Sequence, residues 1–190
     1  MSITLNVTKG LSPDLQKCYR LLKNRKPLMT MLGGATAIAL RRHFRRRNRE
    51  PNKSGFPKAN WWQKEVAQRT ALTGADNNSA TVTIASAQFP LKFYGGTVKA
   101  KRAKYLAIPM HPAAYGKTPR DGTIQGLWLV NGKNPGKKFL ARHEGGKLVF
   151  YFSLVKSATH RPDPRALPDL EKLTAELVAK TESYLEEKLR

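Results

Sequence analysis

The sequence predicts an α+β fold: N-terminal helices and a C-terminal helix packed on a mainly antiparallel β-sheet with a projecting β-hairpin arm. Apolar residues recur every three to four positions near both ends of the chain, and they alternate every two positions in its middle. The pairs Asn131-Gly132 and Gly145-Gly146 separate short apolar runs, which is typical of hairpin turns. We expect a single domain over residues 1–190, with a helical part at 12–72, a sheet part at 80–155 and a last helix at 169–189.

Two helices are expected in the first fifty residues. The Ser-Pro-Asp sequence at 12–14 supplies an N-cap, a proline at the first helical position and an acid in the first turn. A second helix begins at Pro27 and runs to about Arg49, with one apolar stripe. Gly33 and Gly34 lie inside it, each costing about 1 kcal/mol relative to alanine. A closely packed neighbour is therefore expected beside these glycines.

Arginines crowd the end of this second helix: Arg41, Arg42, Arg45, Arg46, Arg47 and Arg49. At 100° per residue they fall on all faces, so this portion is not expected to be buried in an apolar core. We expect the last two turns either to overhang the domain or to insert into something acidic, and so to contact DNA or an acidic partner. Simple solvation of these side chains is the other interpretation.

The middle of the chain is expected to be mainly strands. A short helix over 60–72 begins with Trp61 and Trp62, which we interpret as a hydrophobic anchor rather than a stacking platform for bases. Strands then follow at 81–84, 88–93, 106–108, 127–130, 139–141 and 148–152. The Pro- and Gly-rich loop at 111–122 is long enough to be either a binding loop or a disordered segment.

Residues 94–105 are expected to form a contact arm for another subunit or partner. The arm begins with Gly95 and Gly96, which permit positive φ or the close approach of another chain. It then carries four cations, Lys99, Lys101, Arg102 and Lys104, before the apolar strand at 106–108. Exposed arms of this kind can reach neighbours by adding a strand to their sheets.

Positive charge dominates the chain, because 35 Lys and Arg against 13 Asp and Glu give a formal net charge of +22. Residues 1–160 hold 29 Lys and Arg against 6 Asp and Glu, whereas residues 161–190 hold 6 against 7. A body this basic attracts polyanions with salt-sensitive affinity. DNA or RNA, acidic partner proteins and a simple solubility bias all remain open. The last helix is expected to pack on the basic body of its own chain or of a neighbour.

Residue types that carry catalysis are scarce. Cys18 is the single cysteine and lies on an apolar helix face, and the four histidines show no zinc-site spacing. Six acids in the first 160 residues are a poor supply for a two-metal nuclease. We expect no enzyme, and no catalytic, cofactor-binding or metal-binding residue. No apolar run approaches the roughly 20 residues of a membrane span, and no secretion signal is recognised, so no membrane partner is expected.

Three segments carry a family resemblance: Asn24–Met29 with Leu32, Gly33 and a helix ending near Phe44; Pro51–Pro57 with Trp61; and Gly95–Val98 with Lys101 and Leu106–Pro109. Together they resemble the helical part, the proline-, glycine- and tryptophan-containing loop and the strand–arm–strand of the phage virion morphogenesis (tail completion) family. The resemblance spans roughly residues 12–109, and more loosely 165–168. The loop at 111–122 and the strands at 125–152 match none of its motifs.

The resemblance implies a structural phage virion protein that acts in tail completion and head–tail joining, as a homo-oligomeric ring at the neck. The expected partners are further copies of itself, neighbouring neck and tail proteins, and phage DNA bound without sequence preference. The expected location is the virion tail or neck, and the host cytoplasm during assembly. The alternative is a basic, sequence-independent DNA- or RNA-binding module that uses both basic segments as its footprint.

Overall fold

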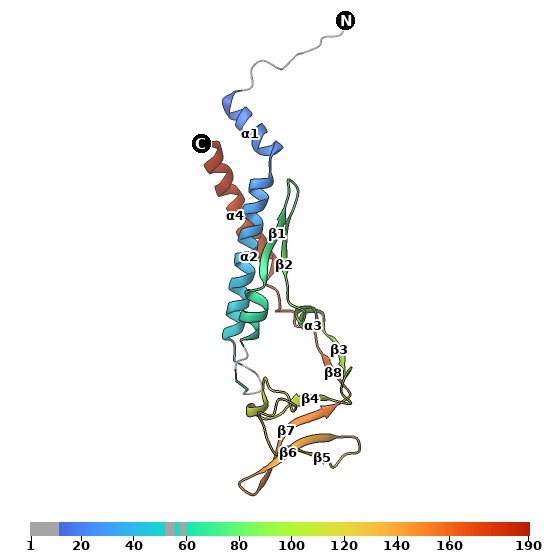
Figure 1. Ribbon diagram of the computed structural model, residues 1–190. Helices are drawn as coiled ribbons and strands as arrows, with labels where there is room; N and C mark the ends of the chain where they lie inside the picture. The colour runs from blue at the N-terminus through green and yellow to red at the C-terminus, as the bar shows by residue number, and fades with distance from the viewer. Residues whose placement is uncertain (1–11, 52–55, 58–59) are drawn as a thin grey trace. The chain divides into compact units, whose positions relative to one another are not determined.

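The computed structural model describes residues 12–51, 56–57 and 60–190, and its element order is helices, then mostly strands, then a last helix (Figure 1). The α+β class is therefore confirmed. The described chain forms two compact units. The helical unit contains the residues up to Arg45, Gln63–Ser86 and Leu167–Arg190, and the sheet unit contains Arg46–Trp62 and Ala87–Ala166. The single domain over 1–190 stays a prediction, and most of the loop expected at Pro51–Pro57 lies outside the described residues.

The three long helices begin where the sequence predicts. In α1 (Pro13–Lys23) the Ser12 hydroxyl accepts a hydrogen bond from the Leu15 amide at 3.3 Å. Helix α2 (Lys26–Arg49) differs from its expected start by one residue. In α4 (Leu170–Leu189) the Asp169 carboxylate accepts from the Glu171 amide at 3.0 Å. Local caps therefore define the starts of α1 and α4. At the start of α2, the Lys26 amide instead donates to the side chain of the distant Asn77.

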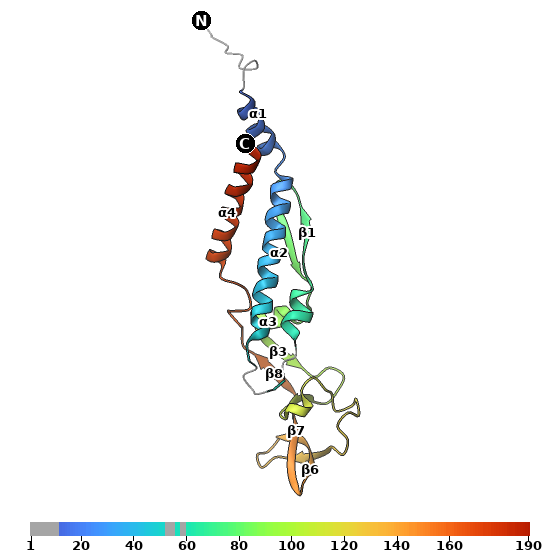
Figure 2. The ribbon, with the colours of Figure 1, turned by 90° about the vertical axis from the view of Figure 1, so that its left-hand side faces the viewer.

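A β-hairpin lies along α2 within the helical unit, as two views show (Figures 1 and 2). It consists of β1 (Thr70–Ala75) and β2 (Ala80–Ile84), paired antiparallel. At Gly33 of α2, an added Cβ would lie 2.5 Å from Leu72 Cδ1 and 2.8 Å from Ala80 Cβ. The closely packed neighbour expected beside the glycines is confirmed at Gly33, whereas Gly34 has open space around it.

Strand β1 corrects the expectation of a helix over 60–72. The structure has a short π-helix, η1 (Trp62–Ala67), and the chain is extended from Thr70 onward. The Thr70 hydroxyl donates to the Val66 carbonyl at 2.8 Å, which satisfies the end of this turn. The alternating strand at 80–84 also needs an antiparallel partner, and the segment before the turn supplies it.

Helix α3 (Phe89–Tyr94) corrects the extended segment expected at 88–93. Pro90 stands in the first turn of this helix, where its missing N–H costs nothing. Phe89 and Phe93 stack one turn apart, with ring centroids separated by 6.2 Å. Gly95 follows at φ 73°, a conformation that glycine adopts without strain and that ends the helix.

The sheet unit is built on an antiparallel sheet with strand order β4-β7-β6-β5. Its strands are β4 (Leu106–Pro109), β5 (Trp128–Asn131), β6 (Lys138–Glu144) and β7 (Lys147–Val155), close to the predicted runs. Gly145 and Gly146 join β6 to β7 with φ of 53° and 78°, as a type I′ hairpin turn requires. This confirms the predicted turn. A separate two-stranded sheet pairs β3 (Gly96–Lys99) with β8 (Ser157–His160).

The loop at 111–122 is partly anchored in the core of the sheet unit. Its first residues form a 3-10 helix, η2 (Pro112–Ala114), and Ala114 is fully buried. Ala114 packs in one apolar cluster with Ile124, Tyr151 and Phe152. The expectation of a disordered segment is therefore wrong for this first turn, and a binding loop stays a prediction.

Hydrogen bonds to Asp121 fold the second half of this loop. Its carboxylate accepts from the Thr123 hydroxyl, from the Thr118 amide at 2.8 Å and from the Thr123 amide at 3.0 Å. These bonds, led by that of the Thr123 hydroxyl, lower the pKa of Asp121 to about 2. Because the pKa is lowered, the carboxylate stabilises the folded loop above its ordinary pKa of 3.8, and this contribution is lost as pH falls through about 2.

The variant Thr123→Val is expected to raise the pKa of Asp121 towards its ordinary value, because the strongest hydrogen-bond donor to the carboxylate is removed. A carboxyl-carbon NMR titration measures this directly. Thr123→Ser keeps a hydroxyl donor and is the matched control. A wild-type titration midpoint near 3.8 would show that the bonds to Thr123 are not formed in solution.

Candidate functional site

The predicted arm at 94–105 is a loop inserted into a β-ribbon, not a β-hairpin. Strands β3 and β4 do not pair with each other, because β3 pairs with β8 and β4 pairs with β7. Lys99 stands opposite Ser157 and Leu106 stands opposite Val155, so six residues on one side face Lys156 alone on the other. The Ala100 amide donates to the Lys156 carbonyl at 3.1 Å and holds the loop at its base. The pairing is long-range, which is why local pattern could not reveal it.

The glycine pair anchors this ribbon. A Cβ added at Gly95 would lie 2.8 Å from the His160 carbonyl oxygen and 2.8 Å from Pro162 Cδ. Gly96 has φ 144° and pairs with His160 at the first position of β3. Both expected uses of glycine, positive φ and close approach, are therefore found within the chain itself. Gly95 and Gly96 fix the start of β3, and the cations lie beyond them.

We call residues 99–105 together with Lys156 the basic bulge. Its cationic residues are all exposed: Lys99, Lys101, Arg102, Lys104 and Lys156. Across the described residues, none of the five forms an ion pair with a carboxylate. Lys138 is a sixth cation at the edge of the bulge. Its Nζ lies 5.4 Å from the centroid of the Tyr105 ring.

The carboxylates of the sheet unit are occupied elsewhere. Glu50 and Asp163 pair with Arg47, Asp121 binds threonines in its loop, and Glu144 pairs with Arg142. These four are the acids of residues 46–62 and 87–166. Intrachain neutralisation of the basic bulge would require one of them to leave its partner. The bulge is therefore an exposed cluster of positive charge.

The arginines at the end of α2 divide into different environments. Arg41 Nε donates to the Thr70 carbonyl at 2.7 Å, and Arg42 pairs with Glu176 at 2.7 Å. Arg45 is exposed. Arg46 and Arg49 are also exposed residues, and both take part in interactions within the chain.

Arg47 is the exception, because its side chain is only 9% exposed. It lies 2.5 Å from both Glu50 and Asp163, and its guanidinium lies 5.1 Å from the ring centroid of Trp62. His43 and Phe44 of the same helix are buried. The expected overhang is thus wrong for this part of α2. A contact of the exposed arginines with DNA or an acidic partner stays a prediction.

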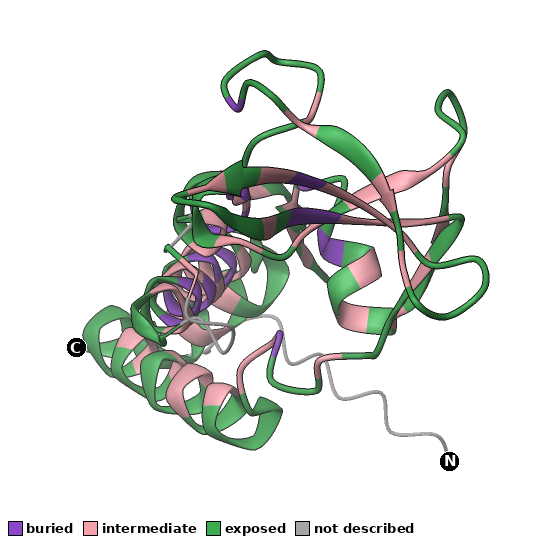
Figure 3. Ribbon diagram, turned by 90° about the horizontal axis from the view of Figure 1, so that it is seen from below, coloured by how far each residue is buried: buried purple, intermediate pink, exposed green. Residues whose placement is uncertain are grey.

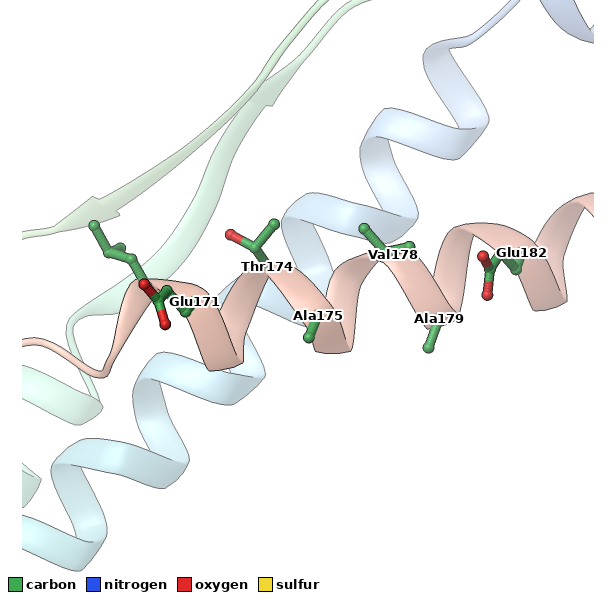
Figure 4. Close-up of a pocket in the computed structure, with 7 residues that line it drawn as sticks. Glu171, Thr174, Ala175, Val178, Ala179 and Glu182 are labelled. Carbon is green, nitrogen blue, oxygen red and sulfur yellow. The ribbon is translucent and has the colours of Figure 1, made fainter.

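Helices α1 and α4 have no fully buried residue, and both carry exposed apolar side chains. In Figure 3, α4 beside the label C is coloured only as exposed or half-buried. On α1, Leu15, Tyr19 and Leu22 are 55%, 60% and 71% exposed. On α4, Leu170 and Val178 are 69% and 51% exposed. A shallow depression of about 620 Å³ follows this face, and its lining residues all belong to α4: Leu170, Glu171, Thr174, Ala175, Val178, Ala179 and Glu182 (Figure 4).

Comparison with models of protein families, with curated proteins and with solved structures finds no match to this chain. The resemblance to tail completion proteins therefore depends on the quoted sequence segments alone. The function has to be argued from the geometry of the two units.

Sequence reasoning missed one polar cluster, which lies on β6 and β7. The hydroxyl of the buried Tyr151 donates to Glu144, and Arg142 Nε donates to the same carboxylate at 2.8 Å. The Tyr151 and Arg142 bonds lower the pKa of Glu144, and the bond to Glu144 raises the pKa of Tyr151. The alternation of β6 places residues 142 and 144 on one face, which is the signal that could have found the pair. Each charged group is satisfied by the others, so the cluster ties β6 to β7.

Within residues 12–51, 56–57 and 60–190, no group of three or more His, Cys, Asp or Glu is arranged to hold a metal ion. In the same part of the chain no helix combines the length and the apolar character needed to cross a bilayer. The features on which a function can be argued are therefore the basic bulge, the exposed arginines of α2 and the uncovered faces of α1 and α4.

Proposed function

We propose that the chain is a structural subunit of a phage virion, acting in tail completion and head–tail joining as a homo-oligomeric ring at the neck. One observation carries the proposal: the amphipathic helices α1 and α4 bury no residue within the described chain. Helical stability in proteins comes mostly from packing an apolar face against something else. Neighbouring molecules could therefore cover the exposed apolar residues of both helices.

The exposed apolar residues of α1 lie together on one side of the helix rather than singly. Leu15, Tyr19 and Leu22 fall on one side of α1, one turn apart from each other. Contiguous exposed apolar patches of this kind mark interaction sites. Two different faces on one subunit allow head-to-tail contacts, which close into a ring when the rotation permits.

The location and the partners are part of the same proposal. The neck of the virion is suggested by the resemblance of residues 12–109 to tail completion proteins. Neighbouring neck and tail proteins would then be further partners, and the host cytoplasm would be the place of assembly. The strong positive charge supports contact with acidic surfaces on those neighbours or with packaged DNA.

A sequence-independent nucleic-acid-binding module is the second candidate function. The basic bulge favours it, because its cations have no carboxylate partner among the described residues. Lysine and arginine bind phosphates by releasing condensed counterions, and this requires no base recognition. The exposed Arg45 of the helical unit would offer a separate contact to phosphate.

Size-exclusion chromatography with light scattering, with and without duplex DNA, separates the two candidates. A ring subunit is expected to form a defined oligomer without DNA, and to bind DNA only weakly. A nucleic-acid module is expected to stay monomeric or dimeric without DNA, and to bind duplex tightly at low salt. A protein that remains monomeric at all concentrations without DNA would contradict the ring.

The triple variant Lys101→Ala, Arg102→Ala, Lys104→Ala is expected to weaken any binding to duplex DNA. The slope of log K against log salt should become shallower by about 0.9 for each phosphate that is no longer neutralised, up to about 2.7 for three. Fluorescence anisotropy at several salt concentrations measures the slope. The matched control is Lys133→Ala, Lys137→Ala, Lys147→Ala, which removes the same charge from exposed residues outside the bulge. Equal slopes for the two variants would show that only net charge matters.

A further inference from the structure

We propose that α1 of one copy packs its exposed apolar face along the exposed face of α4 of a second copy. This inference rests on the proposed function, and names the surfaces through which the ring would form. The contact is heterologous, because it joins two different surfaces of identical subunits. Each subunit would offer α1 to one neighbour and α4 to the other.

The two faces match in length and chemistry. Helix α1 has 11 residues and is therefore about 16 Å long, and the span from Leu170 to Glu182 on α4 is about 18 Å. On α1 the large side chains are Leu15, Tyr19 and Leu22. The centre of the α4 face consists of small or β-branched residues, namely Thr174, Ala175, Val178 and Ala179. Large residues on one helix opposite small ones on the other allow close helix packing.

Figure 4 shows how these side chains lie on α4. Thr174 and Val178 project along one side of the helix, and Ala175 and Ala179 project along another. Glu171 and Glu182 stand at the two ends of this span. A helix laid along the face would therefore meet apolar groups at its centre and a carboxylate at each end.

The charges of the two faces are complementary. Arg20 and Lys23 are exposed on α1, and Glu171 and Glu182 are exposed on α4. Across the described residues, none of these four forms an ion pair. Residues 161–190 are also the segment in which acids outnumber bases, in a chain of net charge +22. A second copy's basic α1 is thus better suited to this face than a second acidic α4 would be.

Helix α1 can make this contact while it keeps its own place in the subunit. Lys17, Cys18 and Leu21 are its half-buried residues, and α1 contacts α4 of its own chain. Leu15, Tyr19 and Leu22 lie on the remaining side. One helix therefore has an inner side for its own subunit and an outer side for the neighbour.

Cysteine cross-linking tests the contact on the full chain. In a Cys18→Ala background, Tyr19→Cys and Val178→Cys are made separately and together, then oxidised mildly and run without reductant. The double variant is expected to give a ladder of covalent dimers, trimers and higher oligomers. A mixture of the two single variants is expected to give dimers only. Each single variant alone is expected to give monomer.

Four outcomes would overturn the inference. A covalent dimer of Val178→Cys alone would mean that α4 pairs with α4. An internally cross-linked monomer of the double variant would mean that the outer face of α1 lies on α4 of its own chain. A defined oligomer without any α1–α4 cross-link would remove this contact but leave the proposed ring intact. A monomer at every concentration would remove the ring and the contact together.

A second measurement uses no cysteine. Tyr19→Glu and Val178→Glu are each expected to raise the dissociation constant of the oligomer by at least about tenfold, as truncation or charging of a central interface residue does. Lys147→Glu, at the exposed start of β7 in the sheet unit, is the charge-changing control. Light scattering across a dilution series measures the constants, and far-UV circular dichroism verifies that each variant is folded. Equal dissociation constants for all three variants would contradict the contact.

Discussion

Arg47→Ala is expected to lower the free energy of unfolding by about 3 kcal/mol or more, the usual cost of removing one partner from a buried ion pair. The Arg47 side chain is 9% exposed and lies 2.5 Å from both Glu50 and Asp163. Asp163 is itself only 21% exposed, so it would be left in a partly buried site without its counter-charge. Packing against the Trp62 ring would disappear as well.

Arg45→Ala is the matched control for this prediction. Arg45 lies two residues earlier in the same helix and is exposed, so its removal should change stability by less than about 0.5 kcal/mol. Chemical denaturation of both variants, followed by tryptophan fluorescence, gives the two values. Equal losses of stability would show that Arg47 is not buried between the two carboxylates in solution.

Gly33→Leu is expected to lower the free energy of unfolding by about 1 to 3 kcal/mol, as overpacking of a filled site does. A Cβ at this position would already lie 2.8 Å from Ala80 Cβ, a distance that real Cβ contacts essentially never show. The side chain of Ala80 has no rotamer by which to move away. Helix α2 and the β1–β2 hairpin would have to separate to make room.

Gly34→Leu is the matched control, because it places the same side chain one residue further along α2. Gly34 has no heavy atom within 4 Å of an added Cβ. Replacing a helical glycine there should raise stability by up to about 1 kcal/mol through helix propensity. Thermal unfolding of the two variants should therefore move in opposite directions. A stable Gly33→Leu protein would contradict the packing of the hairpin on α2.

The features that the sequence predicted correctly are those that depend on near neighbours in the chain. The caps at Ser12 and Asp169, and the Gly145–Gly146 turn, are each determined within a few residues. The close packing at Gly33 could be inferred because a glycine in a helix interior needs a reason. The helix at Pro90 was not predicted, because proline suits both a strand edge and the first turn of a helix.

The features that it could not predict depend on contacts between distant residues. The partner of Arg47, Asp163, lies 116 residues further along the chain. Strand β3 pairs with β8 rather than with its neighbour β4, which turns the expected hairpin arm into an inserted loop. The basic character of residues 99–104 could nevertheless be predicted, because the sequence has several cations and no acid there.

Imaging of purified phage particles with an antibody to this chain tests the central claim most directly. The account predicts label at the head–tail junction, on particles washed at high salt so that proteins held only by charge are removed. It also predicts that particles assembled without the chain carry no label and lack joined tails. Label that is absent from washed particles, or that follows free nucleic acid instead, would contradict a structural subunit of the virion.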